Sequence, residues 1–356
     1  MPKLPHMSQD PQHHPIPHHE LSDDRRWRLA VLGLGRHGLE YAAAIARDSG
    51  CLLSGLVDAR SDLRSFARGC GFQAPLAVSL PRLLERGPLD GVVLCVPAAD
   101  VPGAAARAFE AGLAVLVPGL PAADVAGAER LRANLLTATR PVASGIAVLT
   151  HPLFARTAQM LATGSLGAVR SIRASVQVSR VFGPASLPPV GDVLEHVAFE
   201  FVVLLDQMFG PAAAASARGQ RLYGAGLDEA HVTLTLAMGG SITFDCSWSV
   251  PGYPRRAMVL EVECERGRVL ASDDALELEL DGAAEPTRTV LAGLSEGHTL
   301  EWGEAHATLQ AFTQRLAHGM TANDPLDLAR ALRAVQVLAA IRASVTALGE
   351  RMDVLP

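Results

Sequence analysis

Lysine is almost absent from this sequence of 356 residues. Lysine and arginine together number 31, and Lys3 is the only lysine among them. Lys3 lies within residues 1–24, a segment rich in histidine and proline with almost nothing to bury, which we expect to be a disordered arm. A mechanism that needs a lysine in the folded part of the chain is therefore excluded.

Other signatures of location and partners are missing as well. The five cysteines form no C-x-x-C pair, which suits a reducing compartment. The longest uncharged apolar run, residues 111–123, is too short to span a bilayer. The start of the chain lacks the apolar stretch of a secretory signal, and a net charge of -6 does not suit nucleic acid. We therefore expect a cytoplasmic protein that binds neither membranes nor nucleic acids.

Several catalytic motifs are also absent. The sequence has no G-x-S-x-G, no Walker A and no H-E-x-x-H, which argues against a serine hydrolase, a P-loop enzyme and a zinc enzyme. No metal site is expected. What the chain does have is a hydrophobic content of 49%, enough for a sizeable core, and a length that suits two domains.

Residues 25–147 have the pattern of a parallel sheet. Short, continuously apolar runs at residues 29–33, 52–57, 91–96 and 114–117 alternate with helical segments. Strands that are apolar on both faces belong to sheets covered by helices on both sides. The sequence therefore predicts an N-terminal Rossmann domain, built on a doubly wound parallel sheet.

Residues 148–356 have a different pattern of polar and apolar residues. Polar and apolar residues alternate at 231–236 and again at 242–248, with Gly239-Gly240 as the turn between them. This alternation is typical of antiparallel strands that are exposed on one face. We therefore expect a C-terminal α+β domain with an open, mainly antiparallel sheet.

Two helical patterns, at residues 301–317 and 325–348, end the chain. We expect the closing helix to pack back toward the first domain. The open sheet face needs a cover, and a second copy of the chain is one way to supply it. The second domain is therefore assigned to substrate binding and to homo-oligomer formation through its sheet.

A glycine-rich loop directly follows the first predicted strand. Gly33-Leu34-Gly35-Arg36-His37-Gly38 fits G-x-G-x-x-G and opens the first helix. The first glycine allows the tight turn, the second lets the backbone approach a pyrophosphate, and the third lets the helix pack on the strand. Amides at the helix N-terminus favour the phosphates. The loop predicts a dinucleotide site, against the alternative of a structural turn without a nucleotide.

Asp58 and Arg60 are the candidates that would contact the ribose. Asp58 ends the second predicted strand, where a carboxylate can accept hydrogen bonds from both ribose hydroxyls. Arg60 could stack on adenine or bind a 2′-phosphate. The expected cofactor is therefore NAD or NADP.

The order and spacing of these features resemble the Gfo/Idh/MocA family, the glucose-fructose oxidoreductase and inositol dehydrogenase group, from about residue 28 to 354. Besides the glycine loop, the resemblance rests on Val57-Asp58, Gly91-Val92-Val93-Leu94-Cys95-Val96-Pro97, Thr163-Gly164-Ser165-Leu166-Gly167-Ala168-Val169 and the helix at 332–344. It implies that the first domain binds NAD(P), with Val96 and Pro97 near the cofactor. It also implies that a small hydroxylated or carbonyl substrate reacts over the sheet of the second domain.

The resemblance breaks at the catalytic positions. Family members carry Glu-Lys-Pro where this chain has Pro118-Gly119-Leu120, so Gly119 stands at the lysine position. That lysine helps to polarise or deprotonate the reacting oxygen, and losing such a group costs on the order of two to four decades in rate. Further positions that depart from the family pattern are Ala98, Val101, Leu149, Leu194 and Phe199.

Asp192 and His196 are what remains of the family's second-domain motif. They are four residues apart on one predicted helix and therefore share a face, where a carboxylate can orient an imidazole. We expect His196 to transfer the proton, and Asp192 to orient it or to accept a substrate hydroxyl. The alternative is that Asp192 only caps the helix and that His196 is a satisfied core histidine.

Weaker candidates surround this pair. Arg180 could hold an anionic group of the substrate, as could His151 and Arg156. The alternative for each of them is an ordinary solvated position. Glu195 and Glu200 are assigned to solvated or interface faces.

Three functions remain open. The preferred one is an NAD(P)-dependent oxidoreductase in which His196 transfers the proton without a lysine. The second is a non-redox enzyme, for an elimination, isomerisation or hydrolysis, that uses bound NAD transiently. The third is an inactive nucleotide-binding or partner protein on the same scaffold. Nucleotide binding that is indifferent to substitution at His196 would favour the third.

Overall fold

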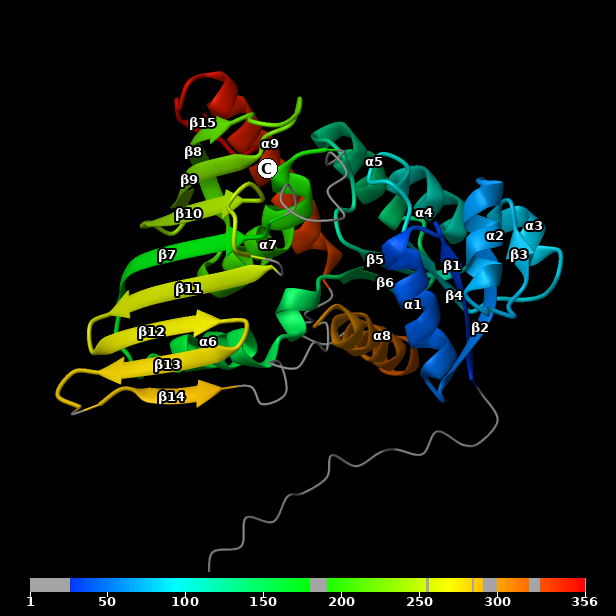
Figure 1. Cartoon of the computed structure of the whole chain (residues 1–356), viewed down its shortest axis with the longest axis horizontal. Coiled ribbons are helices and arrows are strands. Elements are labelled where there is room, and N and C mark those ends of the chain that lie inside the picture. Colours follow the sequence, from blue (N-terminus) through cyan, green and yellow to red (C-terminus); the bar gives the residue numbers. More distant parts are fainter. Residues whose placement is uncertain are drawn as a thin grey trace, which may run out of the picture.

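The computed structural model describes residues 26–179, 191–253, 256–283, 285–290, 300–319 and 327–355. Two sheets lie side by side, with helices between and around them (Figure 1). In these ranges no helix is long and apolar enough to cross a membrane. The predicted arm at residues 1–24 and the loop that begins at Arg180 lie outside the described residues.

The first sheet has six parallel strands in the order β3-β2-β1-β4-β5-β6. Its central strands are buried because helices cover both faces (Figure 1), as their continuously apolar sequences predict. The predicted Rossmann sheet is thereby confirmed. Its elements are β1 (Trp27–Leu32), α1 (Arg36–Arg47), β2 (Cys51–Val57), α2 (Ser61–Gly69), β3 (Leu76–Ala77), α3 (Leu80–Leu84), β4 (Gly91–Leu94), α4 (Val101–Glu110), β5 (Ala114–Pro118), α5 (Val125–Leu135) and β6 (Val142–Gly145).

The second sheet has nine strands in the order β14-β13-β12-β11-β7-β10-β9-β8-β15. Among the described strands, β7 and β10 pair in parallel and the other neighbours are antiparallel. The predicted open, mainly antiparallel sheet is confirmed. The elements up to β14 are η1 (Ala147–Thr150), α6 (Pro152–Ala162), β7 (Val169–Gln177), η2 (Leu194–Ala198), α7 (Phe199–Phe209), β8 (Ala212–Gln220), β9 (Glu229–Leu236), β10 (Ser241–Ser247), β11 (Ala257–Cys264), β12 (Gly267–Ser272), β13 (Ala275–Leu280) and β14 (Thr287–Val290).

The two faces of the second sheet differ in chemistry. Helices α6, η2 and α9 pack against one face, on which every second side chain of the strands is buried. The other face carries cross-strand ion pairs, in which Glu261 contacts Arg173 (3.7 Å) and Arg268 (2.8 Å). The uncovered face is therefore polar, and water can solvate it.

Helix α8 (Leu300–His318) packs with the first domain, although it follows the second sheet in the chain. It contacts α1, β6 and η1. Leu309 and Phe312 are completely buried in one apolar cluster with Leu29 and Val31 of β1. The core of the Rossmann domain is thus completed by a helix from near the C-terminus.

Helix α9 (Leu328–Thr346) joins the two halves of the molecule. It contacts β8 and α7 on one side and α5 and β6 on the other. The chain then ends in β15 (Met352–Asp353), which pairs with β8 at the edge of the second sheet. Side chains on α9 can therefore reach the boundary between the two domains.

Ser344 fastens α9 to the second sheet. Its hydroxyl is completely buried, accepts a hydrogen bond from the Ala217 amide (2.8 Å) and donates one to the Glu350 carbonyl (2.5 Å). We expect Ser344→Ala to lower the free energy of unfolding by about 1–3 kcal/mol, because a buried amide loses its acceptor. The control Ser241→Ala, at an exposed end of β10, should change it by less than about 0.5 kcal/mol. Urea unfolding measures both, and equal effects would contradict the assigned role.

Candidate active site

The glycine loop has the three backbone environments that the motif requires. Gly33 has a φ of 91°, and a Cβ atom there would lie 2.3 Å from the Cys95 carbonyl oxygen. A Cβ atom on Gly38 would lie 1.9 Å from the Gly33 oxygen, so the helix packs directly on the loop. At Gly35, no described atom outside its immediate chain neighbours and its own helix backbone lies within 4 Å of the Cβ position. The backbone is open at the glycine that a pyrophosphate would approach.

Asp58 holds the loop from the end of β2. Its Oδ2 accepts a hydrogen bond from the Leu34 amide (2.8 Å), and its Oδ1 accepts one from the Arg60 amide (2.9 Å). The guanidinium of Arg60 pairs with Asp62, with 2.5 Å between Nη2 and Oδ2. Asp58 is therefore fixed beside the loop, while the charge of Arg60 already has a partner.

The other expected cofactor residues border the same loop. Arg36 and His37 are exposed on the first turn of α1, and both face Glu40. Arg36 Nε lies 3.0 Å from Glu40 Oε1, and His37 Nδ1 lies 3.6 Å from Glu40 Oε2. Directly beyond β4, Val96 is half-buried beside the glycine loop and Pro97 is exposed. The structure thus brings all the predicted cofactor residues to the carboxyl ends of β1, β2 and β4.

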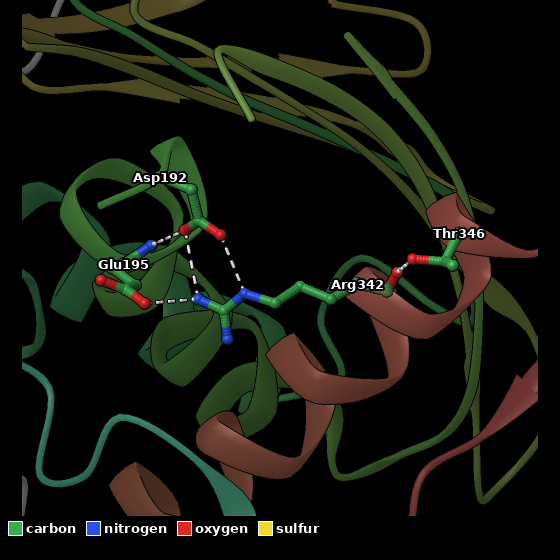
Figure 2. A network of polar contacts seen from close by, with 4 residues as sticks. All are labelled: Asp192, Glu195, Arg342 and Thr346. Carbon is green, nitrogen blue, oxygen red and sulfur yellow. Dashed lines mark hydrogen bonds and ion pairs between the residues drawn. The ribbon is translucent and has the colours of Figure 1, made fainter. Parts of the chain in front are cut away.

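Asp192 begins a second group of polar residues, at the start of η2 and α7. η2 is a π-helical turn, a rare form that is frequent at functional sites. Asp192 is buried, and its Oδ1 accepts a hydrogen bond from the Glu195 amide (3.0 Å), so it caps the helix. Arg342 of α9 donates to both carboxylate oxygens, from Nε to Oδ2 (2.8 Å) and from Nη2 to Oδ1 (3.1 Å) (Figure 2).

His196 is exposed and lies against an aromatic ring. It stacks on Trp248 with 6.1 Å between ring centroids, and Trp248 Nε1 donates to Oδ1 of the buried Asp228 (2.6 Å). Among the described residues, no hydrogen bond joins the Asp192 carboxylate to the His196 ring. The Asp192 carboxylate is held by the Glu195 amide and by Arg342, and its expected role in orienting His196 stays a prediction. His196 is not a core histidine.

The second group is connected to the carboxyl edge of the first sheet through η1. η1 directly follows β6 and packs against α7, the helix that continues from η2. In open α/β sheets, ligands bind at this edge. Gly119 follows β5 at the same edge with a φ of 82°, and no described atom lies within 4 Å of its Cβ position. The space at the expected lysine position is open.

His151 and Arg156, two of the weaker candidates, differ in exposure. His151 is buried beside Phe154, and neither of its ring nitrogens has a hydrogen-bond partner in the described part of the chain. Burial lowers the pKa of the His151 imidazole. Arg156 is exposed on α6, and Arg180 lies outside the described residues. The described residues also contain no group of three or more histidine, cysteine, aspartate or glutamate side chains that could hold a metal ion.

Sequence reasoning missed Arg342, Trp248 and Asp228, and it assigned Glu195 to a solvated or interface face. Glu195 is instead half-buried, and its Oε1 accepts a hydrogen bond from Arg342 Nη2 (2.8 Å) (Figure 2). A usable signal existed for Glu195, because Asp192-x-x-Glu195 is the spacing of a helix capping box. No local signal existed for Arg342, which lies 147 residues further along the chain.

Known structures share this fold. An oxidoreductase from Agrobacterium radiobacter, solved with NAD+, L-tartaric acid and magnesium, matches with a TM-score of 0.79 at 17% identity over 92% of this chain and 98% of its own. GenD2 from gentamicin A biosynthesis, solved with NAD, matches with a TM-score of 0.76 at 22% identity over 94% and 98%. Levoglucosan dehydrogenase, solved with NADH and levoglucosan, matches with a TM-score of 0.79 at 16% identity, over 93% of this chain and 100% of its own.

The fold is that of the Gfo/Idh/MocA oxidoreductases. The resemblance read from the sequence is thereby confirmed at the level of the fold. No protein-family model matches the sequence, and no curated protein matches it. The three-dimensional likeness thus extends over the whole length of the neighbours at a low sequence identity.

The glycine environments predict different effects of two equal substitutions. Gly38→Ala should lower the free energy of unfolding by at least about 2 kcal/mol, because the new Cβ would meet a backbone oxygen that cannot move aside. Gly35→Ala, at the open helix cap, should cost less than about 1 kcal/mol. Urea unfolding of the two variants measures the difference. A Gly38→Ala protein as stable as Gly35→Ala would show that the helix does not pack on the loop.

Proposed function

We propose that this protein is an NAD(P)-dependent oxidoreductase that acts on a small hydroxylated or carbonyl substrate. The observation that carries the proposal is the open backbone of Gly35 at the N-terminus of α1, between Gly33 and Gly38, whose Cβ positions are blocked. This shape leaves room for a pyrophosphate where helix amides point at it. The fold shared with oxidoreductases solved with NAD or NADH supports the same function.

The residues of the first domain fit a dinucleotide. The loop amides would bind the phosphates, and Asp58 would accept the ribose hydroxyls with the lone pairs that its two amide bonds do not use. When bound, the nicotinamide supplies the hydride acceptor or donor. We propose NAD rather than NADP, because a 2′-phosphate would meet the Asp58 carboxylate and would find Arg60 paired with Asp62.

We assign proton transfer to His196. Its ring is exposed near the carboxyl edge of the first sheet and is held against Trp248, which Asp228 fixes in turn. An imidazole exchanges protons near neutral pH, so it can act where Gly119 provides no lysine. Asp192 acts on His196 through the backbone, because its cap holds the helical turn in place.

The substrate class is proposed from the fold neighbours. Two of them were solved with L-tartaric acid and with levoglucosan, which are small hydroxylated molecules. We therefore propose a small polyol, or the carbonyl compound that its oxidation gives. Anion-binding roles for Arg180, His151 and Arg156 stay predictions from the sequence.

Association through the second sheet and a cytoplasmic location complete the proposal. The uncovered face of the sheet carries the ion pairs of Glu261 with Arg173 and Arg268, which suit a polar interface between two copies. The five cysteines are all free thiols, as a reducing compartment requires.

Titration with NADH tests the cofactor site. We expect a dissociation constant for NADH on the order of micromolar and weaker binding of NADPH. Energy transfer from tryptophan to the nicotinamide measures the binding. Gly35→Ala should weaken NADH binding at least about tenfold, because a methyl group takes up space meant for the pyrophosphate. The control Gly69→Ala, at an equally open glycine ending α2, should keep the wild-type affinity. A folded wild-type protein that binds neither nucleotide would contradict the proposal.

One observation, the open space at Gly119, favours a second candidate. Without a lysine the site could serve a non-redox enzyme that uses NAD transiently, or a nucleotide-binding partner protein. A screen of polyols for NAD+ reduction, measured by the absorbance of NADH, distinguishes the oxidoreductase from these two alternatives. Turnover that His196→Ala abolishes supports the oxidoreductase, and NADH binding without any turnover supports the alternatives.

A further inference from the structure

Glu195 carries a carboxyl group that the proposed function has not yet used. It lies on η2 next to His196 and is half-buried, and its Oε1 is held by Nη2 of Arg342 at 2.8 Å. The same guanidinium holds Asp192 through Nε and Nη2 (Figure 2). Three N–H bonds from one arginine therefore fix two carboxylates, and Glu195 cannot rotate away without losing an ion pair.

The second oxygen of Glu195 and the ring of His196 both lie close to Gly191. A Cβ atom on Gly191 would lie 2.9 Å from Glu195 Oε2 and also 2.9 Å from His196 Nε2. The two atoms are therefore no more than about 6 Å apart, a range over which a carboxylate and an imidazole change each other's proton affinity. Gly191 has a φ of 97°, which a residue with a side chain rarely adopts. Glycine at this position lets both groups approach the same point.

The π-helical turn accounts for the meeting of two adjacent side chains. Consecutive residues of a regular helix do not face each other, yet Glu195 and His196 both reach Gly191. Both residues lie within η2, where the turn is wider than in an α-helix. In a regular helix the side chains of Glu195 and His196 would point in different directions, but in this wider turn they reach the same residue.

Three charged groups around Glu195 set its proton affinity. Burial, the largest influence, and the negative charge of Asp192 raise the pKa of the Glu195 carboxyl, whereas the charges of Arg342 and His196 lower it. The net effect is a raised pKa. Such a carboxyl group can take up and release a proton closer to neutral pH, where general acid–base catalysis works best.

We propose that Glu195 is a second proton-transfer group of this site, which exchanges the proton of a substrate hydroxyl jointly with His196 and takes the role that Gly119 leaves open. The proposal rests on the oxidoreductase function. In the oxidation, the substrate O–H bond breaks and its proton joins Glu195 Oε2, giving a neutral carboxylic acid. The carbon-bound hydrogen leaves with both electrons of its bond as the hydride, which a bound NAD+ would accept, and a carbonyl group forms. In the reduction, the carboxylic acid returns its proton to the substrate oxygen.

A carboxyl titration tests the proton pairing without cofactor or substrate. In protein labelled with carbon-13 at the glutamate carboxyl groups, the Glu195 signal is the one that Glu195→Gln removes. We expect its midpoint above the ordinary 4.5, because burial and the charge of Asp192 raise the pKa of this carboxyl. Asp192→Asn should lower this midpoint by removing a negative charge, and His196→Ala should raise it by removing a positive one. The control Glu263→Gln, on the uncovered sheet face, should leave it unchanged.

Kinetics tests the transfer itself. The assay uses whichever of L-tartrate, levoglucosan and L-sorbose the wild type oxidises with NAD+. Glu195→Gln should lower kcat at least about a hundredfold, with KM and NADH affinity within about threefold, and should remove the acidic limb of the pH profile. A purely structural role would change KM and NADH affinity instead.

Two results would overturn the proposal. One is a Glu195 midpoint near 4.5 that responds to neither Asp192→Asn nor His196→Ala. The other is a Glu195→Gln enzyme with the wild-type kcat. Failure of the wild type to bind NADH would overturn the oxidoreductase function instead, and the carboxyl titration would still decide whether Glu195 and His196 share a proton.

Discussion

The ion pairs of Arg342 with Asp192 and Glu195 are the constraint on which the rest of the site depends. Arg342 comes from α9, the helix that contacts elements of both domains. It fixes the point where η2 begins, and with it the place of His196 at the carboxyl edge of the first sheet. The three charges are largely withdrawn from solvent, so removal of the arginine would leave two carboxylates without compensation.

The cluster of Asp192, Glu195 and Arg342 contains two carboxyl groups and one guanidinium, and this excess of carboxyl groups favours proton exchange. Asp192 and Glu195 share one guanidinium, so the carboxylate that is less well bound has an unusual tendency to hold a proton. Asp192 takes two bonds from Arg342 and caps the helix as well, whereas Glu195 takes one. Asp192 is therefore the more firmly held anchor of the helix, and Glu195 is the carboxyl group that we propose exchanges protons.

The sequence predicts the parts of the molecule whose causes are local. Continuously apolar strands and the loop from Gly33 to Gly38 are enough to predict the Rossmann sheet, because each strand and each glycine environment depends on a few adjacent residues. The alternating strands of the second sheet are readable for the same reason. The partner of Asp192 is not readable, since Arg342 lies 150 residues away. The spacing suggests His196 as a partner of Asp192, whereas the contacts of its carboxylate in the structure are with the Glu195 amide and Arg342.

Helix α8 shows how a boundary drawn along the chain can fail in space. Its apolar side, with Leu309 and Phe312, closes the cluster that surrounds β1. During synthesis the first domain therefore remains uncovered on this side until more than 300 residues have been made. Its core depends on contacts between distant parts of the chain, which fold late. The Rossmann half of this protein is not an independent module, and it reaches its final form only together with the rest of the chain.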